Sequence, residues 1–318
     1  MSWRNYRRQI LVTALLAGLW GAFALASPVT FANARIYRSF MSTIPVTTVL
    51  ALGMTLLIVS GDMDMSFPSV SAAAAFVFAW GYARAGLSPW AAFAAALAAG
   101  ALMGWFNGLL VVSVGVPSII ATIGTQFLWR GLALLLSDGM SIPLAQVRDT
   151  GLYHLFVGRV GSWGVPVQAF WALLVAAATG LLLNRRSFGE ALLFIGDNRQ
   201  TAQMVGIPVP RMRKLAFVLM GFLAAFAGLL ATLELNNWWP TQGDGYMLLV
   251  FAAVFVGGTS AYGGQGTIYG TFIGSIIIGI IEAGIVSAGL TGLWTRFVHG
   301  LVIILSLSGY ALFTRRRE

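Results

Sequence analysis

Long apolar runs recur along the whole chain and are separated by short polar or basic segments. Each run is long enough to cross the hydrocarbon core of a membrane, which takes about 20 residues of α-helix. Because the runs are continuous and backbone groups in lipid need internal partners, we expect helices and not barrel strands. The pattern predicts ten spans: Ile10–Ala26, Thr43–Ser60, Ser66–Tyr82, Pro89–Val112, Pro117–Leu136, Val167–Leu183, Leu215–Leu235, Met247–Ser260, Thr267–Ala288 and Leu293–Phe313.

The predicted fold is therefore all-α, a polytopic bundle of about ten transmembrane helices in a single domain over residues 1–318. Composition agrees, since 58% of the residues are hydrophobic and only 9% are charged, against roughly 25% charged in soluble domains. The amino-terminal segment has the basic start and apolar middle of a signal peptide. Because many spans follow it, we interpret it as an uncleaved first span, and an even number of spans places both termini on the same side.

Basic residues gather in three clusters, at the two ends of the chain and in its middle. They hold twelve of the 19 Lys and Arg residues: Arg4, Arg7 and Arg8; Arg185, Arg186, Arg199, Arg211, Arg213 and Lys214; Arg315, Arg316 and Arg317. In the ten-span topology all three clusters fall on one side, which the positive-inside rule makes cytoplasmic. We interpret the net charge of +9 as a result of this topology. We also expect the basic clusters to be attracted to lipid headgroups. No nucleic-acid partner is expected, since the basic residues lie only in short loops.

The sequence lacks the motifs of common enzymatic chemistry. The only lysine, Lys214, follows Arg-Met-Arg without the glycine loop of a nucleotide-binding motif. There is no cysteine, no HExxH and no GxSxG, and the two histidines, His154 and His299, are far apart. We therefore expect no metal site, no cofactor and no catalytic activity.

Two predicted helices carry stripes of glycine at every fourth position. The stripes are Gly100, Gly104 and Gly108, and Gly266, Gly270 and Gly274. Glycine at this spacing lets a neighbouring backbone approach closely. The same device in both halves of the chain indicates either an inverted repeat, as in many transporters, or ordinary helix packing without internal symmetry.

The central loop, residues 184–214, contains an amphipathic stretch between Gly189 and Gly206. We expect its apolar side chains to face the bilayer or protein: Leu192, Leu193, Ile195, Met204 and Val205. Its polar side chains are expected to face water: Asp197, Asn198, Arg199, Gln200 and Gln203. This pattern is typical of an interfacial helix or of a helix that docks on a soluble partner. A plain connector is the alternative, but it would need far fewer residues.

Four stretches resemble one family, the permease subunits of bacterial ATP-binding-cassette importers for simple sugars of the ribose, galactose, xylose and autoinducer-2 type. They are "SGDMDMSFPSV" from Ser60, "NGLLVVSVGVPSIIATIGTQFLWRG" from Asn107, "FGEALLFIGDNRQTAQMVGIPVPRMRK" from Phe188 and "GDGYMLLVFAAVFVGGTSAYGGQGTIYGTFIGSIIIGIIEAGI" from Gly243. They follow the family's order from about Thr43 to His299, which is most of the chain.

The resemblance implies a permease that carries a sugar-like solute across a bacterial inner membrane, with both termini cytoplasmic. It implies a second permease copy or a sister permease, two ATPase subunits and a periplasmic sugar-binding protein as partners. It also implies that the central loop contains the helix that sits in a cleft of the ATPase. The residues of that coupling segment are Gly189, Glu190, Gly196, Asp197, Asn198, Ala202 and Gly206.

Several positions depart from the family's pattern. They are Asp62, Pro68, Met247, Leu249, Glu282, Arg296 and His299, whereas Asp64, Ser66, Asn107, Thr122 and Tyr246 match. The changed positions include candidates for the solute pathway or a gate. The resemblance therefore does not carry over the identity of the solute.

Two carboxylates, Asp62 and Asp64, follow directly on an apolar run. Intramembrane carboxylates usually face a cavity or a partner, because they are costly in lipid. Asp64 and Ser66 precede an apolar helix, so we interpret Asp64 first as a cap on exposed backbone N–H groups and second as part of the pathway. Asp62 is expected to pair with a basic residue such as Arg130 or Arg296.

Further candidates for the solute pathway are uncharged polar residues on apolar helices and two residues of the carboxyl-terminal half. Asn107, Thr122 and Gln126 can hydrogen-bond sugar hydroxyls, although bonds between helices are the more common use of such residues. Tyr246 and Glu282 are pathway or gate candidates through the family resemblance.

Alternatives to the sugar permease remain at this point. One is a proton-coupled secondary transporter in which Asp62 and Asp64 carry protons. Another is the related branched-chain amino-acid type of permease. A membrane enzyme is disfavoured because the sequence lacks a nucleophile, a base and a metal constellation.

Overall fold

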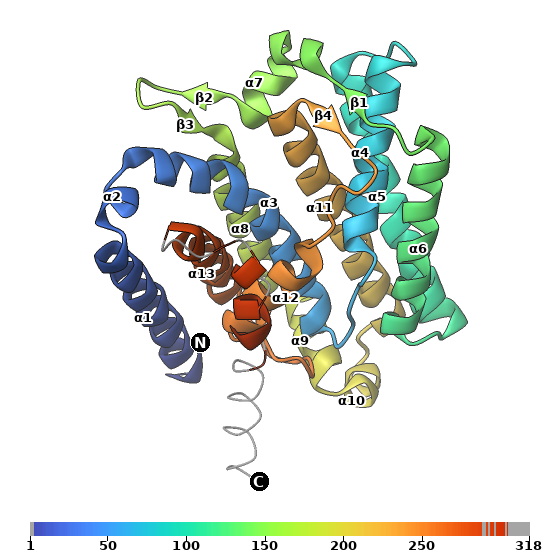
Figure 1. Ribbon diagram of the computed structural model, residues 1–318. Coiled ribbons are helices and arrows are strands. Elements are labelled where there is room, and N and C mark those ends of the chain that lie inside the picture. Colours follow the sequence, from blue (N-terminus) through green and yellow to red (C-terminus); the bar gives the residue numbers. More distant parts are fainter. Residues whose placement is uncertain (1–2, 288–290, 292, 296, 303, 305–318) are drawn as a thin grey trace.

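The computed structural model describes residues 3–287, 291, 293–295, 297–302 and 304 (Figure 1). Its helices are α1 (Trp3–Ala26), α2 (Pro28–Phe31), α3 (Ala34–Val59), α4 (Phe67–Ala83), α5 (Pro89–Leu109), α6 (Ser118–Ser137), α7 (Gly151–Val157), α8 (Val167–Arg185), α9 (Ser187–Asp197), α10 (Arg199–Met204), α11 (Val209–Leu235), α12 (Tyr246–Val256) and α13 (Ile268–Ser287). A π-helical turn, η1 (Leu110–Val114), follows α5, and a 3₁₀-helix, η2 (Ala145–Asp149), precedes α7.

Strands are confined to two short antiparallel pairs outside the bundle. β1 (Ile142–Pro143) pairs with β4 (Asn237–Trp238), and β2 (Arg159–Val160) pairs with β3 (Val165–Pro166). Figure 1 shows both pairs at the same end of the molecule as α7. The described part of the chain is thus a helical bundle, as predicted.

Seven of the described helices are long and apolar enough to cross a membrane, and α4 and α12 are shorter apolar helices. Together they match nine of the ten predicted spans, although several boundaries move. The tenth, Leu293–Phe313, lies mostly outside the described residues. α12 ends at Val256 and not at Ser260, since Gly257 and Gly258 follow and Gly258 has φ of 85°. α5 passes into η1, which ends at Gly115 with φ of 92°.

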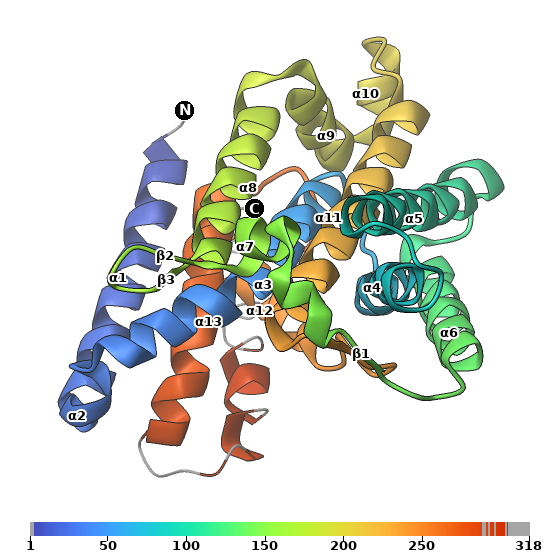
Figure 2. The ribbon, with the colours of Figure 1, turned by 90° about the horizontal axis from the view of Figure 1, so that it is seen from above.

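The centre of the bundle is formed by α3 and α11, which pack against each other. Every residue of α3 from Pro45 to Val59 is buried, as is most of α11. Viewed from above, the two helices lie between α1 on one side and α5 and α6 on the other (Figure 2). Because these central helices contact protein on all faces, they are apolar all round.

The two halves of the bundle repeat one pattern of neighbours. α5 packs against α4 and α11, and α13 packs against α12 and α3. α4 also packs against α11, as α12 does against α3. This pattern fits an inverted repeat, which is one of the two interpretations of the glycine stripes.

The first glycine stripe brings α5 against α11. A Cβ added at Gly100 or Gly104 would overlap the backbone of Gly221 or Phe217 of α11. At Gly108 an added Cβ would lie 3.2 Å from the Cα of Lys214. The backbones of the two helices therefore touch along most of the stripe.

The second stripe brings α13 against α12 and the turn that precedes α13. Added Cβ atoms at Gly270 and Gly274 would overlap the backbone carbonyl groups of Gly257 and Ala253. Gly266 lies in the turn, against the side chains of Val59 and Thr259. A Cβ added at Gly266 would lie 2.6 Å from Val59 Cγ1. Each stripe thus fixes a close helix pair.

The two ends of the bundle differ in structure. Helices α9 and α10 lie at one end, where α1 also begins (Figure 1). The β2–β3 hairpin, α7 and the β1–β4 pair lie at the opposite end. The predicted loop of residues 184–214 is largely helical, because α11 begins at Val209 and α8 extends to Arg185.

Candidate functional site

A polar junction connects α3 with α4 through residues Ser60 to Ser66. Asp64 is fully buried there, and its Oδ1 accepts hydrogen bonds from the backbone N of Ser66 at 2.7 Å and from Ser66 Oγ at 2.6 Å. Asn107 of α5 donates from Nδ2 to Asp64 Oδ2 at 3.2 Å and to Ser66 Oγ at 2.7 Å. The bond to the backbone N–H just before Phe67, the first residue of α4, agrees with a capping role for Asp64.

Two hydroxyl groups of α6 bind the backbone of the same junction. Ser118 Oγ accepts from the backbone N of Met63 at 3.3 Å, and Thr122 Oγ1 accepts from the backbone N of Met65 at 2.9 Å. Gln126, one turn beyond Thr122, is half-buried on α6. The predicted polar candidates Asp64, Ser66, Asn107 and Thr122 are therefore brought together in one hydrogen-bonded network between helices.

Asp62 lies on the other side of the junction and forms two ion pairs. Arg213 donates from Nε to Asp62 Oδ2 at 2.7 Å and from Nη2 to Oδ1 at 2.8 Å. Arg199 Nη2 lies 3.2 Å from Oδ1. Asp62 is only 2% exposed, and a carboxylate buried to this extent needs such partners to remain charged.

The predicted pairing of Asp62 with Arg130 is wrong. Arg130 instead donates from Nη2 to Asp244 at 2.9 Å and from Nη1 to the backbone carbonyl groups of Pro240 and Gln242. Arg296, the other predicted partner, lies outside the described residues. The sequence predicted Arg199 and Arg213 as topology signals near lipid headgroups, with Arg199 also on the water-facing side of the loop, because nothing local indicates that the central loop folds back onto the junction.

The central loop forms two helices, α9 and α10, with a break at Asn198. Asn198 Oδ1 caps α10 by accepting from the backbone N of Thr201 at 3.0 Å. The break allows close contact with the junction, since an added Cβ at Gly196 would overlap the backbone of Val59 and Gly264. Gly264 itself donates from its backbone N to the Val59 carbonyl at 2.9 Å.

The coupling residues proposed from the resemblance divide between these contacts and solvent. Gly189 and Ala202 are buried, and Gly196 is half-buried. The exposed members are Glu190, Asp197, Asn198 and Gly206.

The apolar side chains that were predicted to face the bilayer or protein divide into a buried set and an exposed set. Leu192 and Ile195 are buried as expected, but Met204 is 84% exposed and Val205 is 66% exposed. Phe194 of α9 is also 58% exposed. We call these three exposed side chains, Phe194, Met204 and Val205, the apolar loop patch. The split into two helices explains the difference, because α10 does not continue the face of α9.

A cavity of about 760 Å³ lies between α3, α12 and α13 and reaches the described segment around His299. The predicted pathway residues Tyr246 and Glu282 both line it. Hydroxyl-bearing residues make up much of its polar surface: Ser39, Ser42, Thr43, Thr47 and Ser275. Asp62, Asp64, Ser66, Asn107, Thr122 and Gln126 are not among its lining residues.

The carboxylates that line the cavity differ in their partners. Glu234 is paired with Arg159 at 2.5 Å, and Asp244 is paired with Arg130 at 2.9 Å. Among the described residues, Glu282 forms no ion pair within 4.0 Å. His299 is 3% exposed, and its Nε2 has no hydrogen-bond partner in the described part of the chain. Within the described residues, Glu282 thus lines the cavity without an ion pair, and His299 lines it with an unpartnered Nε2.

The lining hydroxyl groups of α3 were missed by sequence reasoning. Ser39, Thr43 and Thr47 follow one another at intervals of four residues, which places them on one face of a helix. This spacing within an apolar run was the available signal. His299 was noted only as a departure from the family's pattern.

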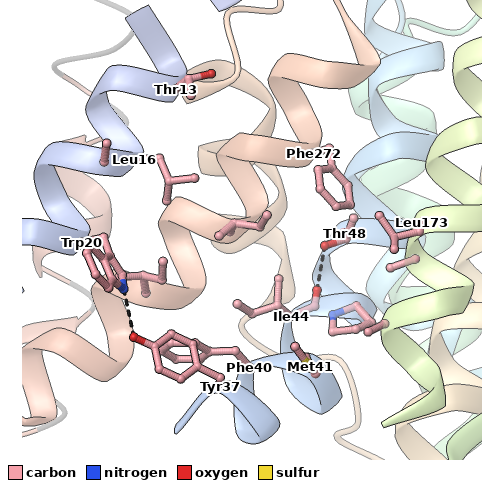
Figure 3. A pocket seen from close by; sticks show the side chains of 16 residues that line it. Thr13, Leu16, Trp20, Tyr37, Phe40, Met41, Ile44, Thr48, Leu173 and Phe272 are labelled. Carbon is pink, nitrogen blue, oxygen red and sulfur yellow. Dashed lines mark hydrogen bonds between the residues drawn. The ribbon is translucent and has the colours of Figure 1, made fainter. Parts of the chain in front are cut away.

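A second pocket, of about 510 Å³, lies between α1, α3, α8 and α13 and has an almost wholly apolar lining (Figure 3). Its few polar groups bond to one another or to the backbone. Trp20 Nε1 donates to Tyr37 Oη at 3.1 Å, and Thr48 Oγ1 donates to the Ile44 carbonyl at 2.9 Å. The lining suits a hydrocarbon chain and offers little to a polar solute.

Comparison with known families places these features in context. Residues 36–307 match the family described as "Branched-chain amino acid transport system / permease component". The chain belongs to this family. Its members are permease subunits of ATP-binding-cassette transporters and are not themselves enzymes. Family membership and the apolar helices together identify a multi-pass inner-membrane protein.

Similar curated proteins are import permeases. The ribose import permease protein RbsC of Bacillus subtilis (strain 168) is 33% identical over 269 residues, which cover 85% of this chain and 82% of that protein. RbsC of Escherichia coli (strain K12) is 29% identical over 307 residues, or 96% and 94% of the two chains. The autoinducer 2 import system permease protein LsrC of Yersinia enterocolitica is 33% identical over 297 residues, or 92% and 80%.

Among solved structures, an inward-facing metal-chelate type ABC transporter is similar to this chain. The TM-score is 0.49 at 14% sequence identity, over 97% of this chain and 99% of that chain.

Proposed function

We propose that this chain, as one transmembrane domain, is the permease subunit of an importer for a monosaccharide or related polyol, driven by separate ATPase subunits. The observation that carries the proposal is the cavity lined by hydroxyl groups, Glu282 and His299. Its volume of about 760 Å³ falls in the range of small-molecule sites. Relatives that import ribose and autoinducer 2 support the same class of solute.

The charges of the cavity favour a neutral solute over an amino acid. The described lining contains Glu234, Asp244 and Glu282 but no Lys or Arg. The carboxylate of an amino acid would meet these acidic groups without a free cation among the described lining residues, which is unfavourable. A sugar instead offers hydroxyl groups, which can donate to Glu282 and to the lining hydroxyls.

The cytoplasmic loop supports coupling to an ATPase. Helices α9 and α10 lie at the end of the bundle where α1 also begins. The apolar loop patch and the side chains of Glu190, Asp197 and Asn198, on these helices or directly beside them in the chain, are exposed. A helix with exposed apolar side chains is suited to a groove on a soluble subunit. We place this end in the cytoplasm, with both termini, and assign alternating access to movements of this loop.

Further partners belong to the same proposal. A periplasmic sugar-binding protein delivers the solute at the end that carries the β2–β3 hairpin, and a second permease copy or sister permease completes the transporter. The apolar pocket of Figure 3 supports contact with a lipid chain.

The proton-coupled alternative is disfavoured by the surroundings of its two carboxylates. Asp62 is held by two arginines, and Asp64 accepts hydrogen bonds from Ser66 and Asn107. Neither is among the residues that line the cavity. A proton carrier needs access to the solute or to water on both sides in turn.

The experiment is uptake by the chain reconstituted with the ATPase subunits and the binding protein proposed as its partners. Radiolabelled ribose, a polyol and leucine are compared at equal concentration with ATP present. The proposal predicts uptake of a sugar or polyol and no uptake of leucine above the protein-free background. Uptake of leucine alone would contradict the assigned solute class.

A further inference from the structure

One carboxylate joins three parts of the chain at the cytoplasmic end of the bundle. Asp62 lies in the α3–α4 junction, Arg199 is the first residue of α10, and Arg213 lies in the second turn of α11. Arg199 also donates from Nη2 to the Gly61 carbonyl at 3.2 Å. Asp62 thereby connects the junction with α10 and with the start of α11. The two arginines lie 137 and 151 residues after Asp62 in the sequence.

The ion cluster is largely removed from water. The side chains of Asp62 and Arg213 are 2% and 12% exposed, and that of Arg199 is 44% exposed. Salt screens exposed pairs strongly but buried pairs much less. The Asp62–Arg213 pair, with two hydrogen bonds in a bidentate geometry, is therefore the strong contact, and Arg199 connects it to the loop surface.

The segment that carries Asp62 is held on its other side by α5 and α6. Two residues after Asp62, Asp64 bonds to Ser66 of the same junction and to Asn107 of α5. The backbone N–H groups of Met63 and Met65 donate to hydroxyls of α6. A displacement of α10 or of the start of α11 therefore acts on this segment through Asp62, and the segment in turn positions the start of α4.

We infer that Asp62 is a positioning residue that transmits movement of the cytoplasmic loop to the α3–α4 junction. This inference rests on the proposed function, in which an ATPase moves that loop. Asp62 touches no solute in this role, since it is not among the residues that line the cavity. The Asp62–Arg213 pair couples nucleotide hydrolysis to opening of the pathway.

The test uses the complete transporter with three variants: Asp62→Asn, Arg213→Gln and the double variant. Asp62→Asn leaves Arg213 without its carboxylate, and Arg213→Gln leaves the buried Asp62 with Arg199 as its remaining cation. Each single substitution therefore lowers the melting temperature. The double variant removes both charges and regains stability relative to either single one. Stability and coupling are thereby separated. Arg211→Gln is the matched control, because it removes an exposed arginine from the same helix two residues away.

All three variants are expected to lose about tenfold in solute uptake, within the usual range of coupling between sites. ATP hydrolysis continues in them but no longer rises when the loaded binding protein is added. Arg211→Gln stays within about twofold of the unmodified chain on both readouts, since it leaves the coupled pair intact.

The double variant could regain uptake and stimulated hydrolysis when it regains its melting temperature. That result would overturn the inference, because the pair would then have a structural role only. Loss of ATPase association in the double variant would overturn it as well. Failure of the unmodified chain to bind any ATPase would instead refute the proposed function itself, so the two failures are distinguishable.

Discussion

Asp62 and Asp64, only two residues apart, acquire different surroundings from the fold. Asp64 accepts hydrogen bonds from neutral donors and organises the start of α4. Asp62 is paired with two arginines, Arg199 of α10 and Arg213 of α11. One carboxylate therefore bonds to α5 inside the bundle, and the other bonds to the central loop and the start of α11.

Replacing Asn107 by alanine should destabilise the junction. The change removes a donor from the buried Asp64 and Ser66 oxygens, at a cost of about 1–3 kcal/mol in unfolding free energy. Thermal unfolding of the purified protein in detergent measures the effect as a lower melting temperature. Asn184→Ala is the control, because Asn184 is exposed and bonds only to the Gly180 carbonyl of its own helix at 3.0 Å. Equal melting temperatures for both variants would contradict the network.

Glu282 is predicted to bind the solute. Glu282→Ala should raise the half-saturation concentration for uptake by about tenfold to a hundredfold, as expected for the loss of a hydrogen bond to a charged group. Glu282→Gln keeps an acceptor oxygen and should have a smaller effect. Uptake measured over a range of solute concentrations gives both values. An unchanged half-saturation concentration in the alanine variant would remove Glu282 from the pathway.

At the scale of elements, the helices were predictable because their apolar runs are long and continuous. The boundaries that moved have local causes, such as the glycines after α12 and the π-helical turn after α5. The division of the central loop into α9 and α10 was not predicted. Its amphipathic pattern fits a single helix. The break comes at Asn198, which caps α10, and the nearby Gly196 packs against the backbone of the distant Val59, a contact that no local pattern indicates.

The glycine stripe of α5 gives a direct test of helix packing. Gly104→Ala should cost about 1–3 kcal/mol, because the new methyl group overlaps the Phe217 carbonyl of α11. Gly124→Ala on α6 is the control, since an added Cβ there meets nothing within 4 Å. It should be neutral or stabilise by about 0.5–1 kcal/mol. Thermal unfolding of the two variants compares them, and a loss of stability in Gly124→Ala alone would contradict the packing.

The apolar loop patch should bind the ATPase. Met204→Asp places a charge in this surface and should reduce co-purification of the ATPase subunit by about tenfold. The chain itself should keep its melting temperature, because Met204 is 84% exposed. Gln203→Asp, on a neighbouring exposed position, controls for the added charge. Undiminished co-purification of the Met204 variant would place the ATPase elsewhere.

At the scale of the whole molecule, sequence reasoning reached the class of fold and the broad function, but it did not reach the contacts between distant segments. The ion pairs of Asp62 join residues 137 and 151 positions apart. Their arginines look like ordinary topology signals in the sequence. Tyr246 and Glu282 line one cavity, whereas Asp64, Ser66, Asn107 and Thr122 form a separate network and Asp62 forms ion pairs. Membership of a cavity depends on how helices cross and not on the polarity of a single residue.

The central claim is that this chain provides a passage whose opening is driven by nucleotide hydrolysis in another subunit. The most direct measurement is solute uptake into proteoliposomes by three preparations: the complete transporter, the same transporter with a hydrolysis-deficient ATPase, and this chain alone under an imposed proton gradient. The account predicts uptake only by the complete transporter with active ATPase. Uptake by the isolated chain that stops when the gradient is dissipated would contradict it.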